Sequence, residues 1–195
     1  LRIIREKNII FINPDNFEQD LKNNKNQRKI LLTIDDGFSS FYENAWPILK
    51  EKKIPFILFV STREVGSNNY MTWDQIRELK KENFVEIGNH SHTHEYLVEE
   101  SYDTIKSDIE KSISIFKNEL GNNSRFFSYP FGEYSLEFKN IIKDAGTATV
   151  RDHVADLTLL QVKAAQARNE TMINNDVAEF IFNLETGLEQ GNTQL

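Results

Sequence analysis

The chain has no cysteine among its 195 residues. This absence excludes disulfide bonds, thiolate metal ligands and a cysteine nucleophile, so histidine, aspartate and glutamate are left to hold any metal ion. No apolar run approaches the roughly 20 residues that span a bilayer, and no membrane span is expected. Basic clusters with interleaved aromatic residues are also missing, and the formal net charge is −7. Nucleic acid is therefore not an expected partner, whereas a neutral or cationic substrate fits this charge.

The composition that remains is that of a globular protein, with 39% hydrophobic and 27% charged residues. A chain of this length supports one domain with a core of its own. It begins at Leu1, and residues 1–12 mix charged with apolar side chains. This start lacks the uninterrupted apolar core of a signal peptide, and we expect a fragment or a processed form.

Strand-like and helix-like segments alternate from residue 28 to about residue 150, a pattern typical of parallel βαβ units. The predicted strands are residues 29–34, 56–60, 84–88, 125–129 and 147–150. The predicted helices are residues 72–82, 102–120 and 135–145, with a further helix that starts at Ser39 or Ser40 and is kinked or broken at Pro47. The helix at 102–120 has the steadiest apolar spacing, and Gly121 stands at its C-cap position.

The last part of the chain has a different pattern, because residues 154–188 are typical of one or two amphipathic helices. Their narrow apolar stripe consists of Ile173, Val177, Ile181, Leu184 and Leu188. Such a stripe faces a core or a partner chain more often than a membrane, so a helix-mediated oligomer is a hypothesis. We expect residues 1–150 to form the catalytic domain and residues 151–195 a helical segment packed on it.

The predicted fold class is α/β, a distorted or incomplete (β/α) barrel with parallel strands and an added C-terminal helical segment. Too few strands are predicted after residue 147 to close a regular barrel. Irregular closure, a contribution from another chain and truncation of the domain are the three alternatives.

Two polar motifs end predicted strands: Thr-Ile-Asp-Asp-Gly at 33–37 and His-Ser-His-Thr-His at 90–94. The carboxyl ends of parallel strands face one mouth, so these side chains can converge. One aspartate and two histidines supply the three protein ligands of a catalytic zinc site and leave a position for water. The second aspartate can then act as general base, provided that a turn at Gly37 brings both carboxylates to the same side. Each motif alone is often only a turn or a surface segment, but together they favour a hydrolytic metal site.

These motifs resemble those of the polysaccharide deacetylase family, which shares the chitooligosaccharide deacetylase homology domain. Residues 41–50, 54–56 and 71–76 also fit, especially the branch that acts on the poly-N-acetylglucosamine of biofilms. The resemblance covers roughly residues 17–146. It implies a divalent metal, with zinc the expected ion, bound by Asp36, His90 and His94. It further implies Asp35 as the catalytic base and His92 as a spacer.

A third family motif, an Arg paired with a Pro-aromatic-Gly loop, is matched in the loop at residues 128–132. The resemblance implies that the backbone N–H of Phe131 donates to the oxyanion and that Tyr129, Pro130 and Gly132 bind substrate. A Pro-Gly turn lined by aromatic residues is the plain alternative. The family's Arg is replaced by a serine, and Arg125 lies on the opposite face of a regular strand.

The function implied is a metal-dependent hydrolase that removes N-acetyl groups from N-acetylglucosamine-containing polysaccharide and releases acetate. His153 is the one histidine after the second motif, and it is the candidate general acid for the leaving amine. A non-catalytic carbohydrate-binding or scaffold protein and an O-acetyl sugar esterase are the alternatives. By resemblance, the polysaccharide substrate places the protein in the cell envelope or outside the cytoplasm.

Overall fold

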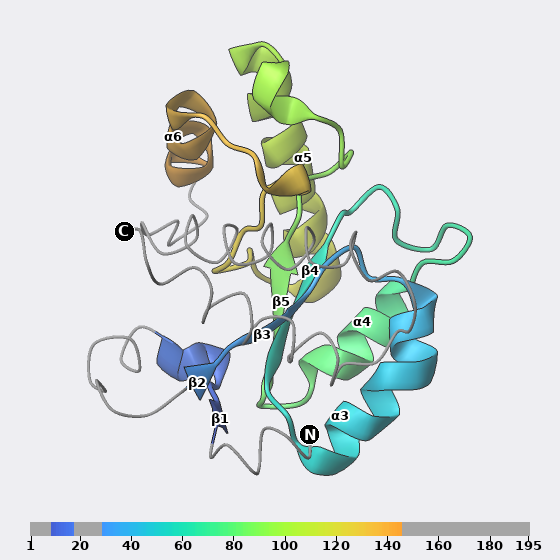
Figure 1. The fold of residues 1–195 in the computed structure, drawn as a ribbon. Helices are drawn as coiled ribbons and strands as arrows, with labels where there is room; N and C mark the ends of the chain where they lie inside the picture. Colours follow the sequence, from blue (N-terminus) through green and yellow to red (C-terminus); the bar gives the residue numbers. More distant parts are fainter. Residues whose placement is uncertain (1–8, 18–28, 146–195) are drawn as a thin grey trace, which may run out of the picture.

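The computed structural model describes residues 9–17 and 29–145, and its centre is a parallel sheet with the strand order β3-β4-β5 (Figure 1). These strands are β3 (Leu32–Ile34), β4 (Phe56–Val60) and β5 (Val85–Asn89). A second, two-stranded parallel sheet pairs β1 (Ile10–Phe11) with β2 (Lys29–Ile30). The parallel strands predicted for an α/β fold are therefore confirmed in the described part of the chain.

In the described ranges, four α-helices follow the strands, as the apolar spacing predicts. They are α3 (Trp46–Lys52), α4 (Trp73–Lys80), α5 (Tyr102–Leu120) and α6 (Leu136–Asp144). Short 3₁₀ turns occur at Pro14–Asn16, Leu97–Glu99 and Pro130–Gly132. None of the helices in the described ranges is long and apolar enough to cross a membrane.

Helix boundaries follow from side-chain caps. Helix α4 starts at a capping box, in which the Gln75 N–H donates to the Thr72 hydroxyl and the Thr72 N–H donates to the Gln75 side chain. Helix α5 ends at Gly121, whose φ of 80° is the left-handed conformation of a C-cap. In place of the kink or break predicted at Pro47, the structure has a change of helix type before that residue. A five-residue π-helical turn (η2, Phe41–Ala45) precedes α3, because proline has no N–H and can stand only at the start of that helix.

Helices α3, α4 and α5 cover one and the same face of the sheet. Every second residue of β4 lies in one core cluster with Trp46 of α3, Ile76 of α4 and Phe116 of α5. All five residues of β4 are at most 1% exposed, as expected of a central strand buried on both faces. The second core cluster joins α5 to α6 and to the segment around Phe127.

The strand predicted at residues 125–129 is much shorter than expected, since only Phe127 forms a parallel bridge, with Asn89 of β5. The Ser124 hydroxyl donates to the carbonyl of Ile87, a β5 acceptor that a backbone N–H of a regular strand would otherwise use. Pro130, two residues after Ser128, cannot donate, so pairing stops there. The segment still lies beside the carboxyl end of β5, because Phe127 pairs there with Asn89. The predicted strand at 147–150 and the helices at 154–188, with their apolar stripe, lie outside the described residues.

Candidate metal centre

Asp36 is placed by a tight turn directly after β3. The Gly37 N–H donates to the carbonyl of Asp35 at 2.9 Å, which closes a three-residue γ-turn with Asp36 at its centre. Asp36 and Gly37 both have a positive φ, 72° and 73°. The carbonyl of Gly37 accepts the Met71 N–H at 2.9 Å and so anchors the turn. The expected turn is confirmed, although Asp36 itself, rather than Gly37, is its central residue.

His90 follows β5 and is held in one orientation. Its side chain is only 3% exposed, and Nδ1 lies 2.7 Å from the carbonyl oxygen of Ser128. A carbonyl can only accept, so Nδ1 donates a proton in this contact, and Nε2 is the nitrogen left to bind a metal ion. Nε2 lies 3.6 Å from Oδ1 of Asp36. The second ring nitrogen of His90 is thus the one directed towards the aspartate.

His94 reaches the same carboxylate from the end of the loop. Its Nε2 lies 3.2 Å from Oδ1 of Asp36, and the two imidazole centroids are 4.9 Å apart. The hydrogen bond to Asp36 raises the pKa of His94, burial opposes this rise, and the charges of Asp36 and Asp35 add to it. Asp35 is therefore close enough to act electrostatically on the same centre.

The three side chains fit a divalent ion. One ligand atom from each of Asp36, His90 and His94 lies within 4.8 Å of the others. Tetrahedral zinc with bonds of about 2.0–2.1 Å separates its ligand atoms by roughly 3.3 Å. The separations of 3.2 and 3.6 Å from the carboxylate oxygen to the two nitrogens are close to this value. The structure therefore brings the three predicted ligands together in a set that can hold zinc.

The loop predicted to bind substrate borders this centre. Phe131 has a φ of 61°, and its 58% exposed ring lies 5.1 Å from the ring of His94. Tyr129 differs, because its ring is 1% exposed and lies in the core with Phe138. Burial raises the pKa of Tyr129, and its hydroxyl has no hydrogen-bond partner in the part of the chain described. If Tyr129 contacts substrate, it therefore does so through its backbone atoms and not through its ring.

Two further residues considered for the site, Arg125 and His153, are not found beside the metal centre in the described part of the chain. Arg125 binds Glu86 at 2.8 Å and Asp15 at 2.5 Å, so its guanidinium is committed to partners other than Asp35. His153 lies outside the described residues.

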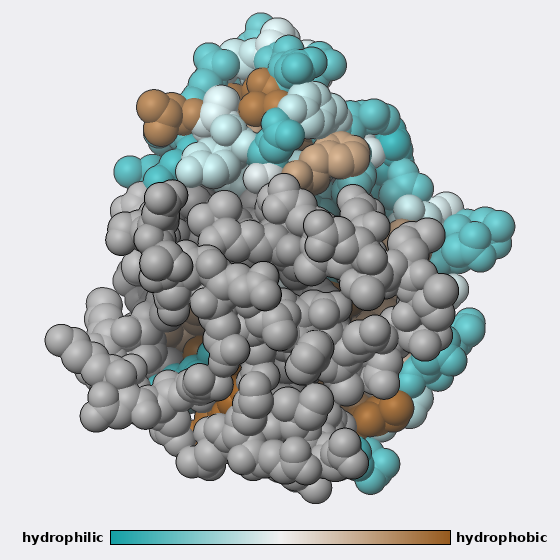
Figure 2. Space-filling view, in the orientation of Figure 1, coloured by the Kyte–Doolittle hydropathy of each residue, from teal (hydrophilic) through white to brown (hydrophobic). Residues whose placement is uncertain are grey.

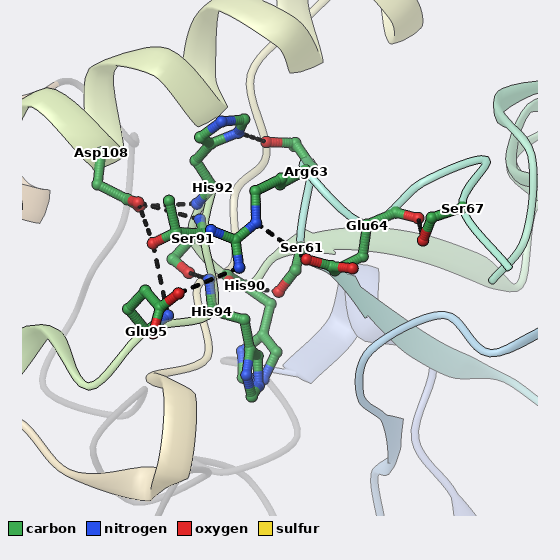
Figure 3. A network of polar contacts seen from close by, with 12 residues as sticks. Ser61, Arg63, Glu64, Ser67, His90, Ser91, His92, His94, Glu95 and Asp108 are labelled. Atoms are coloured by element: carbon green, nitrogen blue, oxygen red, sulfur yellow. Dashed lines mark hydrogen bonds and ion pairs between the residues drawn. The ribbon is translucent and has the colours of Figure 1, made fainter. Parts of the chain in front are cut away.

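Sequence reasoning missed Asp108, a carboxylate on α5 that is only 7% exposed. It accepts hydrogen bonds from the backbone N–H groups of His92 and Thr93, and Figure 3 shows it beside the loop that carries the histidines. The sequence does carry a signal for this residue, because Asp108 is a charged residue next to Ile109 on the apolar stripe of α5. In the same view the ring of His92 points away from the paired imidazoles, and its Nδ1 lies 2.8 Å from the Thr62 hydroxyl.

Comparison with known proteins extends these observations. A family model described as "Polysaccharide deacetylase" matches residues 22–150, which is more than half of the chain. The chain is 30% identical over 133 residues to the poly-beta-1,6-N-acetyl-D-glucosamine N-deacetylase of Staphylococcus aureus strain MSSA476. This match covers 62% of the chain and 46% of that protein, so the chain spans about half the length of the curated relatives it matches.

Two solved structures superpose on this chain. IcaB from Ammonifex degensii superposes with a TM-score of 0.68 at 26% identity, over 73% of this chain and 68% of that one. The Streptococcus pyogenes deacetylase PplD, solved in complex with acetate, superposes with a TM-score of 0.67 at 25% identity, over 75% of this chain and 66% of that one. The described elements are therefore similar to those of these two solved deacetylases.

Proposed function

Because the chain belongs to the polysaccharide deacetylase family, we propose that it is a metal-dependent hydrolase that removes N-acetyl groups from an N-acetylglucosamine-containing polysaccharide. The observation that carries this proposal is the convergence of Asp36, His90 and His94 on one point next to Asp35. The name of the similar Staphylococcus aureus protein supports a poly-β-1,6-linked substrate. Acetate and a free amine on the polymer are the products.

The residues of the site divide the work between them. Asp36, His90 and His94 would hold a divalent ion, which would supply a Lewis acid for the acetamide carbonyl and lower the pKa of a bound water. Asp35 takes the proton of the attacking water at its carboxylate. The Phe131 N–H donates to the oxyanion that develops on the carbonyl oxygen. His153 is the proposed donor of the proton that the leaving amine requires.

The proposal also covers the loop beside the metal centre, the fold around it and the location of the protein. Pro130, Gly132 and the backbone of Tyr129 form the wall that the acetylated sugar contacts. We propose that the sheet is part of a distorted or incomplete barrel, to which residues 151–195 add a C-terminal segment. The helices packed on one face of the parallel sheet are the evidence for this proposal. A polymer substrate of this class places the protein in the cell envelope or outside the cytoplasm.

The decisive experiment measures acetate release from N-acetylated and from O-acetylated glucosamine oligosaccharides, each with and without a chelator. We expect release from the N-acetylated substrate that stops on chelation and returns with zinc. Asp35→Asn is expected to keep stoichiometric zinc and lose turnover, whereas His90→Ala is expected to lose the zinc. Asp103→Asn, an exposed charge change on α5, is the matched control and should keep both. Undiminished turnover in Asp35→Asn would remove it as the base.

A non-catalytic carbohydrate-binding protein is the second candidate. It is favoured by one observation, namely that a serine stands at position 128 in the third motif while Arg125 is bound to Glu86 and Asp15. Oligosaccharide binding without acetate release from either substrate would select this candidate. Release from the O-acetylated substrate alone would select the esterase.

A further inference from the structure

The loop from His90 to His94 leaves the sheet and must bring its last residue back beside its first. Two of its residues, Ser91 and His94, have positive φ values of 68° and 55°. Non-glycine residues adopt such values only where surrounding contacts impose them. The contacts that hold this loop are therefore part of the metal centre, because they decide where the Nε2 of His94 lies.

One carboxylate provides the densest of these contacts. Asp108 Oδ1 accepts the His92 N–H at 2.7 Å, and Oδ2 accepts the Thr93 N–H at 3.0 Å and the Thr93 hydroxyl at 2.6 Å (Figure 3). All three donors lie in the two residues that precede His94. Asp108 is 7% exposed on a helix whose neighbouring core residues are apolar.

Hydrogen bonds within the loop, and others to the segment that follows β4, hold the rest of the loop. The Asn89 side chain accepts the Ser91 N–H at 2.9 Å, and the Ser91 hydroxyl accepts the His94 N–H at 3.0 Å. On the other side, the N–H groups of Thr62 and Arg63 donate to the carbonyls of Ser91 and His92. Asp108 is the one anchor that binds the loop from α5 through a charged group.

We propose that Asp108 is a positioning residue of the metal centre, which sets the loop so that the imidazoles of His90 and His94 face Asp36 before an ion arrives. This inference rests on the proposed metal-dependent function. Charge-assisted bonds to a carboxylate are stronger than neutral ones, so the buried charge suits the task of holding a strained loop. A preformed ligand set does not have to order the loop at the moment of binding, and its metal affinity is higher for that reason.

An amide cannot replace this carboxylate. Both oxygens of Asp108 face backbone N–H groups, one of His92 and one of Thr93. In Asp108→Asn the –NH₂ group must stand against one of these donors, whichever way the side chain is turned. One backbone N–H then loses its acceptor, and the segment before His94 is released.

The test uses the whole chain and has two readouts besides activity. Zinc affinity is measured by calorimetry, and the exchange of the His92 and Thr93 amide hydrogens is measured by NMR in metal-free protein. For Asp108→Asn we expect affinity to fall on the order of 10- to 100-fold, as for other residues that orient metal ligands, and the two amides to exchange faster. The visible spectrum of the Co²⁺ form should change in shape, because it reports the geometry of the ligands.

Three further variants separate positioning from loss of stability. Asp103→Asn makes the same charge change at an exposed position of α5, and Ile109→Val weakens the same buried face without touching the loop. Both should keep wild-type affinity and the wild-type Co²⁺ spectrum. Thr93→Val removes one donor to Asp108 and should show a smaller loss than Asp108→Asn, which keeps the test available if Asp108→Asn folds poorly.

Unchanged affinity and amide exchange in Asp108→Asn would overturn the inference, as would an equal loss of affinity in Ile109→Val. If the wild type binds no zinc, the proposed function fails on its own. The amide exchange in metal-free protein still decides whether Asp108 holds the loop.

Discussion

Strained backbone is concentrated at the candidate centre. Six non-glycine residues in the described ranges have a positive φ, and four of them belong to the site: Asp36, Ser91, His94 and Phe131. A left-handed conformation costs roughly 1–2 kcal/mol for a residue with a Cβ atom. Strain of this kind persists where a ligand must be aimed, so its location is independent support for the assignment.

Two glycines allow the contribution of the Asp36 turn to be measured. Gly37 and Gly66 both have a positive φ, 73° and 83°, and both leave room for a methyl group, with at most one atom at 3.8 Å. Gly37→Ala and Gly66→Ala should each lower the free energy of unfolding by about 1–2 kcal/mol, from backbone strain alone. Only Gly37→Ala should also weaken zinc binding, because it lies next to Asp36. Equal zinc affinity in the two variants would show that the turn does not position the carboxylate.

The pKa of His94 predicts how metal-free protein responds to pH. Asp36 raises this pKa, and a raised histidine pKa contributes stability that is complete below about pH 6.5 and is lost as the pH rises through the folded value. Burial lowers the pKa of His92, which acts with the opposite sign, so the comparison must isolate His94. The difference in unfolding free energy between wild type and Asp36→Asn, measured by denaturation without metal, should shrink between pH 6 and pH 8. A constant difference would contradict this prediction.

At the scale of elements, apolar runs and caps predicted most of the described fold. Strand β4 is confirmed at both ends because Pro55 precedes five consecutive apolar residues, and α5 is confirmed because Ser101 and Gly121 cap it. The length predicted for the strand around Phe127 was wrong, because the Ser124 hydroxyl there takes the place of a backbone N–H in the hydrogen bonding between strands. Hydrogen bonds from side chains to backbone have no periodic signature in the sequence.

The same limit applies to the candidate site. Residue type and spacing predicted a set of one aspartate and two histidines, because metal ligands must be side chains of a few kinds, and the family resemblance implied that they are Asp36, His90 and His94. The acceptor that orients His90 is a backbone carbonyl, which every residue possesses, so no sequence signal distinguishes Ser128. Asp108 does have a sequence signal, because it is a charged residue on the apolar stripe of α5.

The approach of β4 to β5 requires a glycine. Gly88 pairs with Phe59, and a Cβ atom at Gly88 would lie 2.2 Å from Cδ1 of that ring. The ring is 1% exposed and has little freedom to move, so Gly88→Ala should cost about 1–3 kcal/mol of unfolding free energy. A double-mutant cycle with Phe59→Leu tests the cause, because the alanine should cost less when the ring is absent. An unchanged cost would place the strain elsewhere.

At the scale of the whole molecule, the face drawn in Figure 2 carries mainly hydrophilic residues where the described part of the chain is visible, with hydrophobic ones in separate patches. The candidate metal centre lies at the carboxyl end of the three-stranded sheet. It joins Asp36, which follows β3, to the two histidines that follow β5, with β4 between them. An ion bound there links both outer strands of the three-stranded sheet.

Zinc should therefore stabilise the folded chain by mass action. Binding to the native state alone contributes about 2.7 kcal/mol when free zinc is 100 times its dissociation constant. The unfolded chain still carries three histidines within residues 90–94, so weak binding there makes the observed gain smaller. Denaturation with zinc and with a chelator should show a higher transition midpoint in zinc for the wild type and for Asp103→Asn. His90→Ala should show no gain, because the carboxylate of Asp36 and one imidazole leave the ion with two protein ligands. A gain in His90→Ala equal to that of the wild type would mean that zinc stabilises the chain at another place.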